Sequence, residues 1–336
     1  MGRVSTEPAP TPARSAGAAA VLARSRGELA AALADAPDPR AVVMTMGALH
    51  EGHFDLVREA ARRVGPAGTV VVTIFVNPLQ FAPTEDLDSY PRDLEGDLAG
   101  LTRTLTGVDG ALGVGRLVVF APTPEVIYPA GQPAVRIDPG PIATVLEGRT
   151  RPTHFAGVCQ VVLTLMHLTA PRWALFGRKD AQQLAIIESM VRDLAVPLEI
   201  VPVDIRRESD GLAMSSRNAY LSPEQRRRAL ALSRALQAGR DAAAQAAGSG
   251  TRPDPAAIRR AALASLEAAD GVEIDYVALV DPAGFEDLTD AGLGLPRRAP
   301  VHEDAGEGLP AVGLLAVAAR VGTTRLIDNT LIDLHP

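Results

Sequence analysis

The chain has 336 residues, of which 47% are hydrophobic and 22% charged, and it carries a formal net charge of −7. This composition suits about two globular domains with a substantial core, and the negative charge with an aromatic content of 4% argues against nucleic-acid binding and base stacking. The single cysteine, Cys159, excludes an internal disulfide, and no apolar run reaches the roughly 18 residues that span a bilayer, so we expect a cytoplasmic protein with no membrane partner and no nucleic-acid partner.

Residues 1–20 are rich in Pro, Ala, Ser and Thr and lack the apolar core of a signal peptide, which predicts a disordered tail. Apolar residues at helical spacing then predict a helix over 21–36, ended by Pro37 and Pro39. The following strands are expected to be buried on both faces, as in a parallel sheet, because apolar and β-branched residues run through them without polar alternation. They lie at 42–44, 69–76, 117–120, 173–176 and 198–203.

Helices are expected between these strands, notably at 54–61, 158–168 and 181–194. The alternation predicts an α/β domain over 21–205 with a Rossmann-like, doubly wound parallel sheet. Past Arg206 the composition changes. We expect residues 206–336 to form a smaller α+β domain with alanine-rich helices at 223–248 and 255–269, strands at 272–281 and 313–321, and a mobile loop at 292–309.

The segment Thr45-Met46-Gly47-Ala48-Leu49-His50-Glu51-Gly52-His53 is the most informative part of the chain. A strand, a tight turn and a helix start place backbone N–H groups and the positive end of a helix dipole against a phosphate. Histidines three residues apart share one face of the first helical turn, so both imidazoles can point at one anion. A pair of surface histidines on an ordinary loop is the alternative.

Polar residues also follow other predicted strands, and ligands of doubly wound sheets bind beyond the carboxyl ends of the strands. The amides of Asn77 and Gln80 can bond a substrate hydroxyl or carboxylate, or satisfy a local turn. Lys179 is a compact charge suited to polyphosphate. Asp180 stands where it can cap the next helix, and Gln183 faces the same way.

Met214-Ser215-Ser216-Arg217-Asn218 combines two hydroxyls with a guanidinium, which suits a β/γ-phosphate or a leaving pyrophosphate, although a surface turn has the same composition. An acid such as Asp97 near a triphosphate would help to hold Mg²⁺, or belong to a solvated face. The sequence has no Walker A motif and no G-x-G-x-x-G in a strand-to-helix setting. Another device must therefore handle the phosphates.

Several motifs occur together in a fixed order. His50-Glu51-Gly52-His53 and Met214-Ser215-Ser216-Arg217 are similar to the paired signatures of the H-x-G-H nucleotidyltransferase superfamily. More narrowly, the chain resembles the pantoate–β-alanine ligase (pantothenate synthetase) family. The motifs that carry this resemblance are T-M-G-A-L-H-E-G-H, I-F-V-N-P-L-Q-F, D-L-D-x-Y-P-R, R-P-x-H-F-x-G-V, F-G-x-K-D-x-Q-Q and D-G-L-A-M-S-S-R-N-x-Y-L, followed by T-T-R-L-I-D-N at 323–329.

The resemblance implies an ATP-dependent ligase that condenses D-pantoate with β-alanine to pantothenate through a pantoyl adenylate, releasing pyrophosphate and AMP. It implies a homodimer that uses Mg²⁺, with Asp97 as the candidate ligand, and a C-terminal domain that covers the site. Catalytic roles fall on His53, His50, Lys179, Ser215, Ser216 and Arg217, and substrate contacts on Gln80, Gln183 and Asn77. The ATP contacts are Met46, Gly47, Ala48, Leu49, His50, Glu51, Gly52, His53, Gly177, Arg178, Lys179, Asp180, Arg206, Met214, Ser215, Ser216 and Arg217.

Some positions depart from the family pattern, namely Met44, Gly96, Arg178, Ala181 and Arg206. Gly96 replaces an acid beside Asp97, which weakens the metal assignment there. Two other functions stay open. A cytidylyl- or adenylyltransferase would keep both signatures without needing Gln80 and Gln183. A nucleotide-binding regulatory or assembly protein would have lost turnover, which the retained His50, His53, Lys179, Ser216 and Arg217 argue against.

Overall fold

The computed structural model describes residues 20–81, 87, 90–107, 113–289 and 310–335. The predicted tail, apart from Ala20, and the predicted loop at 292–309 lie outside these residues. The strands are β1 (Val21–Ala23), β2 (Arg40–Thr45), β3 (Thr69–Ile74), β4 (Arg116–Phe120), β5 (Trp173–Gly177), β6 (Glu199–Val203), β7 (Val272–Val280), β8 (Val312–Val321) and β9 (Thr324–Asp333).

The α-helices are α1 (Arg26–Ala34), α2 (Glu51–Val64), α3 (Leu94–Leu105), α4 (Pro124–Ile127), α5 (Glu147–Thr150), α6 (His154–Thr169), α7 (Ala181–Asp193), α8 (Pro223–Gly248) and α9 (Pro255–Glu267). Four short 3₁₀ turns are also present in the described residues: η1 (Pro78–Gln80), η2 (Pro141–Thr144), η3 (Arg178–Asp180) and η4 (Ser216–Tyr220). No helix among the described residues is both long and apolar enough to cross a membrane.

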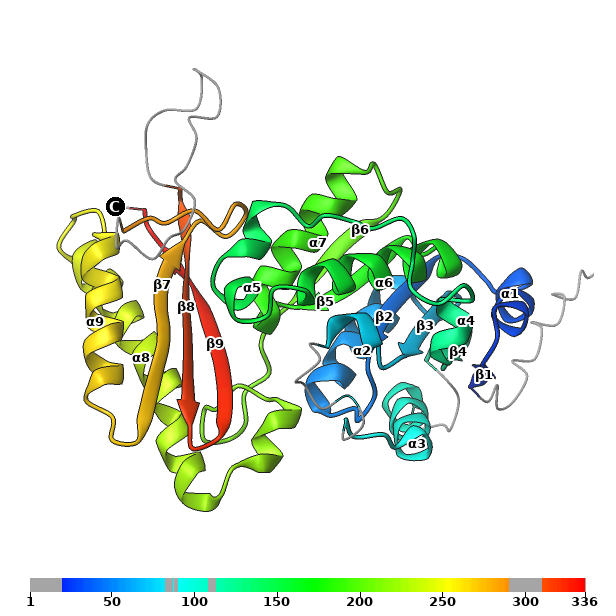
Figure 1. Cartoon of the computed structure of the whole chain (residues 1–336), viewed down its shortest axis with the longest axis horizontal. Coiled ribbons are helices and arrows are strands. Elements are labelled where there is room, and N and C mark those ends of the chain that lie inside the picture. The colour runs from blue at the N-terminus through cyan, green and yellow to red at the C-terminus, as the bar shows by residue number, and fades with distance from the viewer. Residues whose placement is uncertain (1–19, 82–86, 88–89, 108–112, 290–309, 336) are drawn as a thin grey trace, which may run out of the picture.

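The first sheet has six parallel strands in the order β1-β4-β3-β2-β5-β6, which confirms the predicted Rossmann-like architecture. Alternate residues of a strand point to opposite faces. Val42 and Val71 accordingly join the core on one face, with α6 and α7, while Val43 and Val72 join the core under α2 and α3 on the other. Both faces are covered (Figure 1), which is why these strands are apolar throughout.

The helix predicted over 21–36 is partly wrong, because its first residues form β1. Val21 pairs in parallel with Val118 of β4, and the helix begins only after Ser25. The Ser25 hydroxyl accepts from the Glu28 N–H while the Glu28 side chain returns to the Ser25 N–H, a capping box that defines the start of α1. A strand of three residues is too short for periodicity to reveal.

Strand β2 pairs with β3 on one side and with β5 on the other, as in Ala41 opposite Trp173. The chain therefore runs outward from β2 in both directions, and the order reverses between β2 and β5. Ligands of doubly wound sheets bind beyond the carboxyl ends of the strands at such a reversal. The histidine motif follows β2 and the Lys179 segment follows β5, so this topology places the two side by side.

The second sheet is antiparallel, in the order β7-β8-β9. Strand β9 is an element that the sequence analysis did not predict; it forms a hairpin with β8. Helices α8 and α9 cover one face of this sheet, and the other face turns toward the first domain (Figure 1), where Tyr276 and Ala316 pack with Val145 and Leu146. The predicted boundary at 205/206 lies in the connection between β6 and α8 and stays a prediction.

We expect Gly157→Ala to lower the free energy of unfolding by about 1–3 kcal/mol. Gly157 of α6 lies against η1, where a Cβ would overlap the Leu79 carbonyl, a backbone group that cannot swing aside. Gly248→Ala is the matched control, because the space around it is open. Equal denaturant midpoints for the two variants would show that the approach of α6 to η1 is not as tight as the structure has it.

Candidate active site

Two imidazoles form the cap of α2. His50 is the N-cap residue, and its Nδ1 accepts from the Gly52 N–H at 3.2 Å, while the Nδ1 of His53 accepts from the His50 N–H at 3.3 Å. The ring centroids are 4.1 Å apart. A nitrogen that accepts a backbone N–H carries no proton, so each neutral ring bears its proton on Nε2.

Both histidines are held in the neutral form. Burial lowers the pKa of His53 from 6.5 to about 3, and the nearby His50 adds to that effect. Burial, followed by the positive charge of Lys179, lowers the pKa of His50 as well. The pair therefore offers two uncharged Nε2–H donors at neutral pH, near the positive charge of Lys179.

Asp97 supports the turn that precedes these histidines. Its carboxylate accepts from the Leu49 N–H at 2.7 Å and the Ala48 N–H at 3.1 Å, and the residue is 4% exposed. Gly47 has a φ of +89°, and a Cβ there would press against Asp97 Oδ2, so the turn requires glycine at this position. The amides of Ala48, Leu49 and Gly52 therefore donate to acceptors within the chain. The expectation that backbone amides of this turn face a phosphate stays a prediction.

Asp97 as a metal ligand stays a prediction. Both of its oxygens are engaged by backbone amides, and burial raises its pKa above the ordinary carboxylate value, against the lowering effect of those hydrogen bonds. Among the described residues, no cluster of three or more His, Cys, Asp or Glu side chains could hold a metal ion. The contacts observed for Asp97 hold the turn that precedes the two histidines.

The Lys179 turn is η3, between β5 and α7. Asp180 makes no side-chain capping hydrogen bond to α7, so the predicted cap is wrong. Its carboxylate lies 3.6 Å from the Lys179 Nζ instead. Burial raises the pKa of Asp180, but the positive charges of Lys179 and Arg217 lower it by a larger amount. The pKa therefore lies below its ordinary value, and the carboxylate stays charged. Arg178 turns away to pair with Asp204 at 3.2 Å.

Asn77 is fully buried and has its hydrogen bonds satisfied within the protein. Its Nδ2 donates to the Gln80 Oε1 at 2.8 Å and the Gly157 carbonyl at 3.0 Å, and its Oδ1 accepts from the Tyr128 hydroxyl at 2.9 Å and the Leu79 N–H at 3.3 Å. Four bonds use the full capacity of an amide. The predicted substrate contact of Asn77 stays a prediction, and in the structure its side chain holds the Gln80 amide in place.

The loop from Arg206 to Arg217 lies against the histidine motif. The Met214 sulfur accepts from the Gly52 N–H at 3.3 Å, and Arg206 pairs with Asp55 of α2 at 3.1 Å. Ser215 caps η4 by accepting from the Arg217 N–H at 3.3 Å. This loop was predicted to bind ATP, and the structure brings it beside the histidines that carry the same prediction.

Two cavities meet at Lys179. The inner cavity is lined by Lys179, Leu212, Ala213, Ser215, Arg217, Asn218, Leu232, Arg325, Leu326, Ile327 and Asp328. The interdomain cavity is lined by Glu147, Arg151, His154, Phe155, Lys179, Asp180, Ala181, Gln182, Gln183, Arg217, Tyr276, Phe285, Leu314, Ala316, Ile327, Asp328 and Asn329. Gln183 therefore lines the same cavity as Asp180, as the spacing of these two residues predicted.

Residues of β7 and β9 also line these two cavities, and the sequence analysis assigned no role to them. Arg325 of β9 pairs with Glu147 at 2.6 Å and with Asp275 at 2.7 Å, and the Tyr276 hydroxyl donates to Glu147 at 2.9 Å. Burial lowers the pKa of Arg325, but the carboxylates of Glu147 and Asp275 raise it by a larger amount, so the guanidinium stays charged. Strand β9 contains most of the T-T-R-L-I-D-N motif at 323–329. That motif was a sign that the segment matters, but nothing in the sequence spacing placed the segment at the site.

The chain has relatives of known activity that match it along most of its length. The family model described as pantoate-beta-alanine ligase matches residues 22–331. The pantothenate synthetase of Streptomyces coelicolor is 46% identical over 354 residues, covering 94% of this chain and 96% of that protein. Pantothenate synthetase 4 of Frankia alni is 53% identical over 290 residues, covering 86% and 82%.

Solved structures agree in fold. The crystal structure of pantothenate synthetase from Thermus thermophilus has a TM-score of 0.77 and 41% identity, covering 94% of this chain and 99% of that one. Pantoate-beta-alanine ligase from Francisella tularensis, crystallised with beta-gamma ATP and beta-alanine, has a TM-score of 0.66 and 27% identity, covering 93% and 98%. With its fold, its motifs and these relatives in agreement, the chain belongs to the pantoate–β-alanine ligase family, whose activity forms pantothenate.

Proposed function

We propose that the enzyme forms pantothenate in two steps, through a pantoyl adenylate. In the first step a carboxylate oxygen of D-pantoate attacks the α-phosphorus of ATP, the bond to the bridging oxygen breaks, and pyrophosphate leaves. In the second step the amine of β-alanine attacks the acyl carbon, AMP leaves, and the amine loses a proton to form the amide. The substrate supplies the nucleophile, so the protein acts by positioning and charge stabilisation.

The observation that carries this proposal is the meeting of the two histidines, the Lys179 turn and the Met214 loop at the strand-order reversal. Neutral Nε2–H groups of His50 and His53 donate to phosphate oxygens, and Lys179 and Arg217 supply positive charge for the departing pyrophosphate. Neutral donors suit this position because two adjacent imidazolium ions would repel each other when the site is empty.

We assign the remaining contacts as follows. Gln80 and Gln183 hold pantoate, and Gln80 also approaches β-alanine, while Asn77 keeps the Gln80 amide in one orientation. The hydroxyls of Ser215 and Ser216 bind the leaving pyrophosphate. The other ATP contacts are Met46, Gly47, Ala48, Leu49, Glu51, Gly52, Gly177, Arg178, Asp180, Arg206 and Met214. The Francisella relative, crystallised with an ATP compound and beta-alanine, supports these two substrates.

We further propose that ATP binds as its Mg²⁺ complex. Mg²⁺ keeps several waters and is commonly held through substrate phosphates and one or two carboxylates. The candidate carboxylate is Asp97, whose oxygens already bind backbone amides, so in this proposal the metal is held mainly by the triphosphate. We also propose a homodimer, a C-terminal domain over 206–336 that covers the site, and a cytoplasmic location, where ATP is the energy source.

His53→Ala is expected to reduce the rate of pyrophosphate release from ATP and D-pantoate by roughly 10²-fold or more, because a phosphate donor and the partner of the His50 N–H are both lost. His167→Ala, on the exposed side of α6, is the control for a histidine outside the site. Turnover of His53→Ala within twofold of that control would refute the phosphate role.

His53 should stay neutral well below pH 6.5. Because the folded pKa of His53, about 3, lies below its ordinary value of 6.5, the folded protein resists protonation. Its contribution to stability is complete above pH 6.5 and is lost as the pH falls toward 3. Imidazole NMR of the enzyme between pH 8 and 5 should show His53 as the uncharged Nε2–H tautomer throughout. A titration of His53 centred near 6.5 would contradict the buried cap.

Gln183→Ala is expected to raise the KM for D-pantoate at least tenfold more than the KM for ATP, because it removes a substrate hydrogen bond at one subsite. Gln245→Ala, an exposed position on α8, controls for the substitution. Initial rates with each substrate varied in turn provide the measurement. Equal increases in the two KM values would remove Gln183 from the pantoate subsite.

A further inference from the structure

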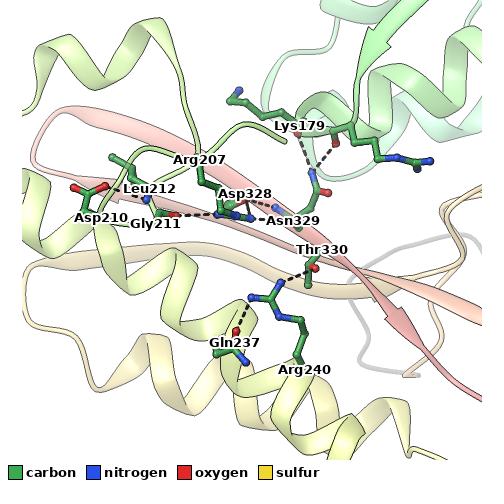
Figure 2. A network of polar contacts seen from close by, with 12 residues as sticks. Lys179, Arg207, Asp210, Gly211, Leu212, Gln237, Arg240, Asp328, Asn329 and Thr330 are labelled. Atoms are coloured by element: carbon green, nitrogen blue, oxygen red, sulfur yellow. Dashed lines mark hydrogen bonds and ion pairs between the residues drawn. The ribbon is translucent and has the colours of Figure 1, made fainter. Parts of the chain in front are cut away.

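The turn that carries Lys179 is held from outside its own domain. Asn329 of β9 directs its Nδ2 at two successive carbonyls, those of Arg178 at 3.0 Å and Lys179 at 2.9 Å. Neither η3 nor α7 has a side-chain capping hydrogen bond. Figure 2 shows the Asn329 amide reaching across to this turn, so the backbone from which the Lys179 side chain extends depends on a C-terminal residue.

Asn329 is itself fixed by an ion pair with a buried carboxylate. Its N–H donates to Asp328 Oδ1 at 2.8 Å, and Asp328, whose side chain is 2% exposed, receives two bonds from Arg207 at 2.7 and 3.0 Å. Arg207 also donates to the Gly211 carbonyl at 3.1 Å and forms a β-bridge with Ala213. A planar guanidinium that binds both carboxylate oxygens holds a single orientation.

This arrangement joins the two segments expected to bind phosphates. At one end of this set of contacts, Arg207 bridges Ala213, which is followed by Met214 and the Ser215–Arg217 loop. At the other end, Asn329 holds the Lys179 turn. Lys179, Ser215, Arg217 and Asp328 line the same inner cavity. The cations on both segments therefore share one buried anchor on β9.

We propose that Asn329 is a positioning residue for adenylate formation, which sets the location of Lys179 relative to the Ser215–Arg217 loop through the Arg207–Asp328 pair. This inference rests on the proposed function. Asn329 does not touch substrate in this scheme; it acts through Lys179. Displacing a charged group by about 1 Å can cost on the order of 10²-fold in rate, so a backbone anchor is sufficient to matter.

The test is a double-mutant cycle. Asn329→Ala is expected to lower kcat for pyrophosphate release from ATP and D-pantoate by roughly tenfold or more. In a Lys179→Ala background the same change should cost less than threefold, because no ammonium group remains to be positioned. A merely structural role would lower the active fraction by the same factor in both backgrounds, so equal factors would overturn the proposal.

Thr330→Ala is the matched control from the same strand. Its Oγ1 accepts from Arg240 of α8 at 3.1 Å, a contact within the C-terminal domain that Figure 2 also shows. It should retain near-normal kcat. Asn329→Asp keeps the side-chain shape but turns an acceptor toward two carbonyls, so it should be at least as slow as Asn329→Ala. An Asn329→Asp variant that folds with the activity of Thr330→Ala would overturn the proposal.

Binding separates this inference from the proposed function. Affinity for a non-hydrolysable ATP analogue, measured by calorimetry on the same variants, does not depend on turnover. If the unmodified enzyme released no pyrophosphate from ATP and D-pantoate, the proposed function would fail. The coupling of Asn329 to Lys179 would then be decided by affinity, where additive losses would refute it and non-additive losses would support it.

Discussion

The pairing of β2 with β5 is the constraint on which the rest of the site depends. These strands are distant in sequence, with β3, β4 and three helices of eight or more residues between them, yet Val42 lies opposite Ala174 and Val43 opposite Leu175. The parallel register brings their carboxyl ends to the same edge of the sheet, where the order of strands reverses. The histidine cap of α2 and Lys179 of η3 lie near each other for that reason.

The site then resolves an electrostatic problem. It has to attract a polyanion, yet it gathers Lys179, Arg217 and two histidines in a partly buried space, where like charges repel strongly. Burial of the histidines, with Nδ1 accepting from the backbone, keeps them neutral, so they donate hydrogen bonds without adding charge. Asp180 offsets part of the remaining positive charge. The amides of the preceding turn are used for structure, with Asp97 as their common acceptor.

The C-terminal sheet contributes polar contacts as well as apolar packing. One face of its sheet packs its own helices, and the other packs apolar residues against the first domain. Within that second contact, polar side chains of β9 reach the first domain at two places: Arg325 binds Glu147, and Asn329 binds the Lys179 turn. Because buried polar groups require specific partners, these contacts define the orientation of the two sheets more narrowly than apolar packing does.

The sequence by itself determined the α/β class, five strands of the first sheet and the segments that carry the site, because apolar runs, glycine turns and the histidine motif are local signals. It did not reveal β1, which is three residues long, or β9, whose burial depends on its hairpin partner. It also predicted that the Asp180 side chain caps α7, which is wrong, since a sequence shows which groups a residue carries but not which partners bind them. Only the tertiary structure decided the strand order, the neutral state of the histidines and the reach of Asn329 to Lys179, because each of these depends on contacts between residues far apart in the chain.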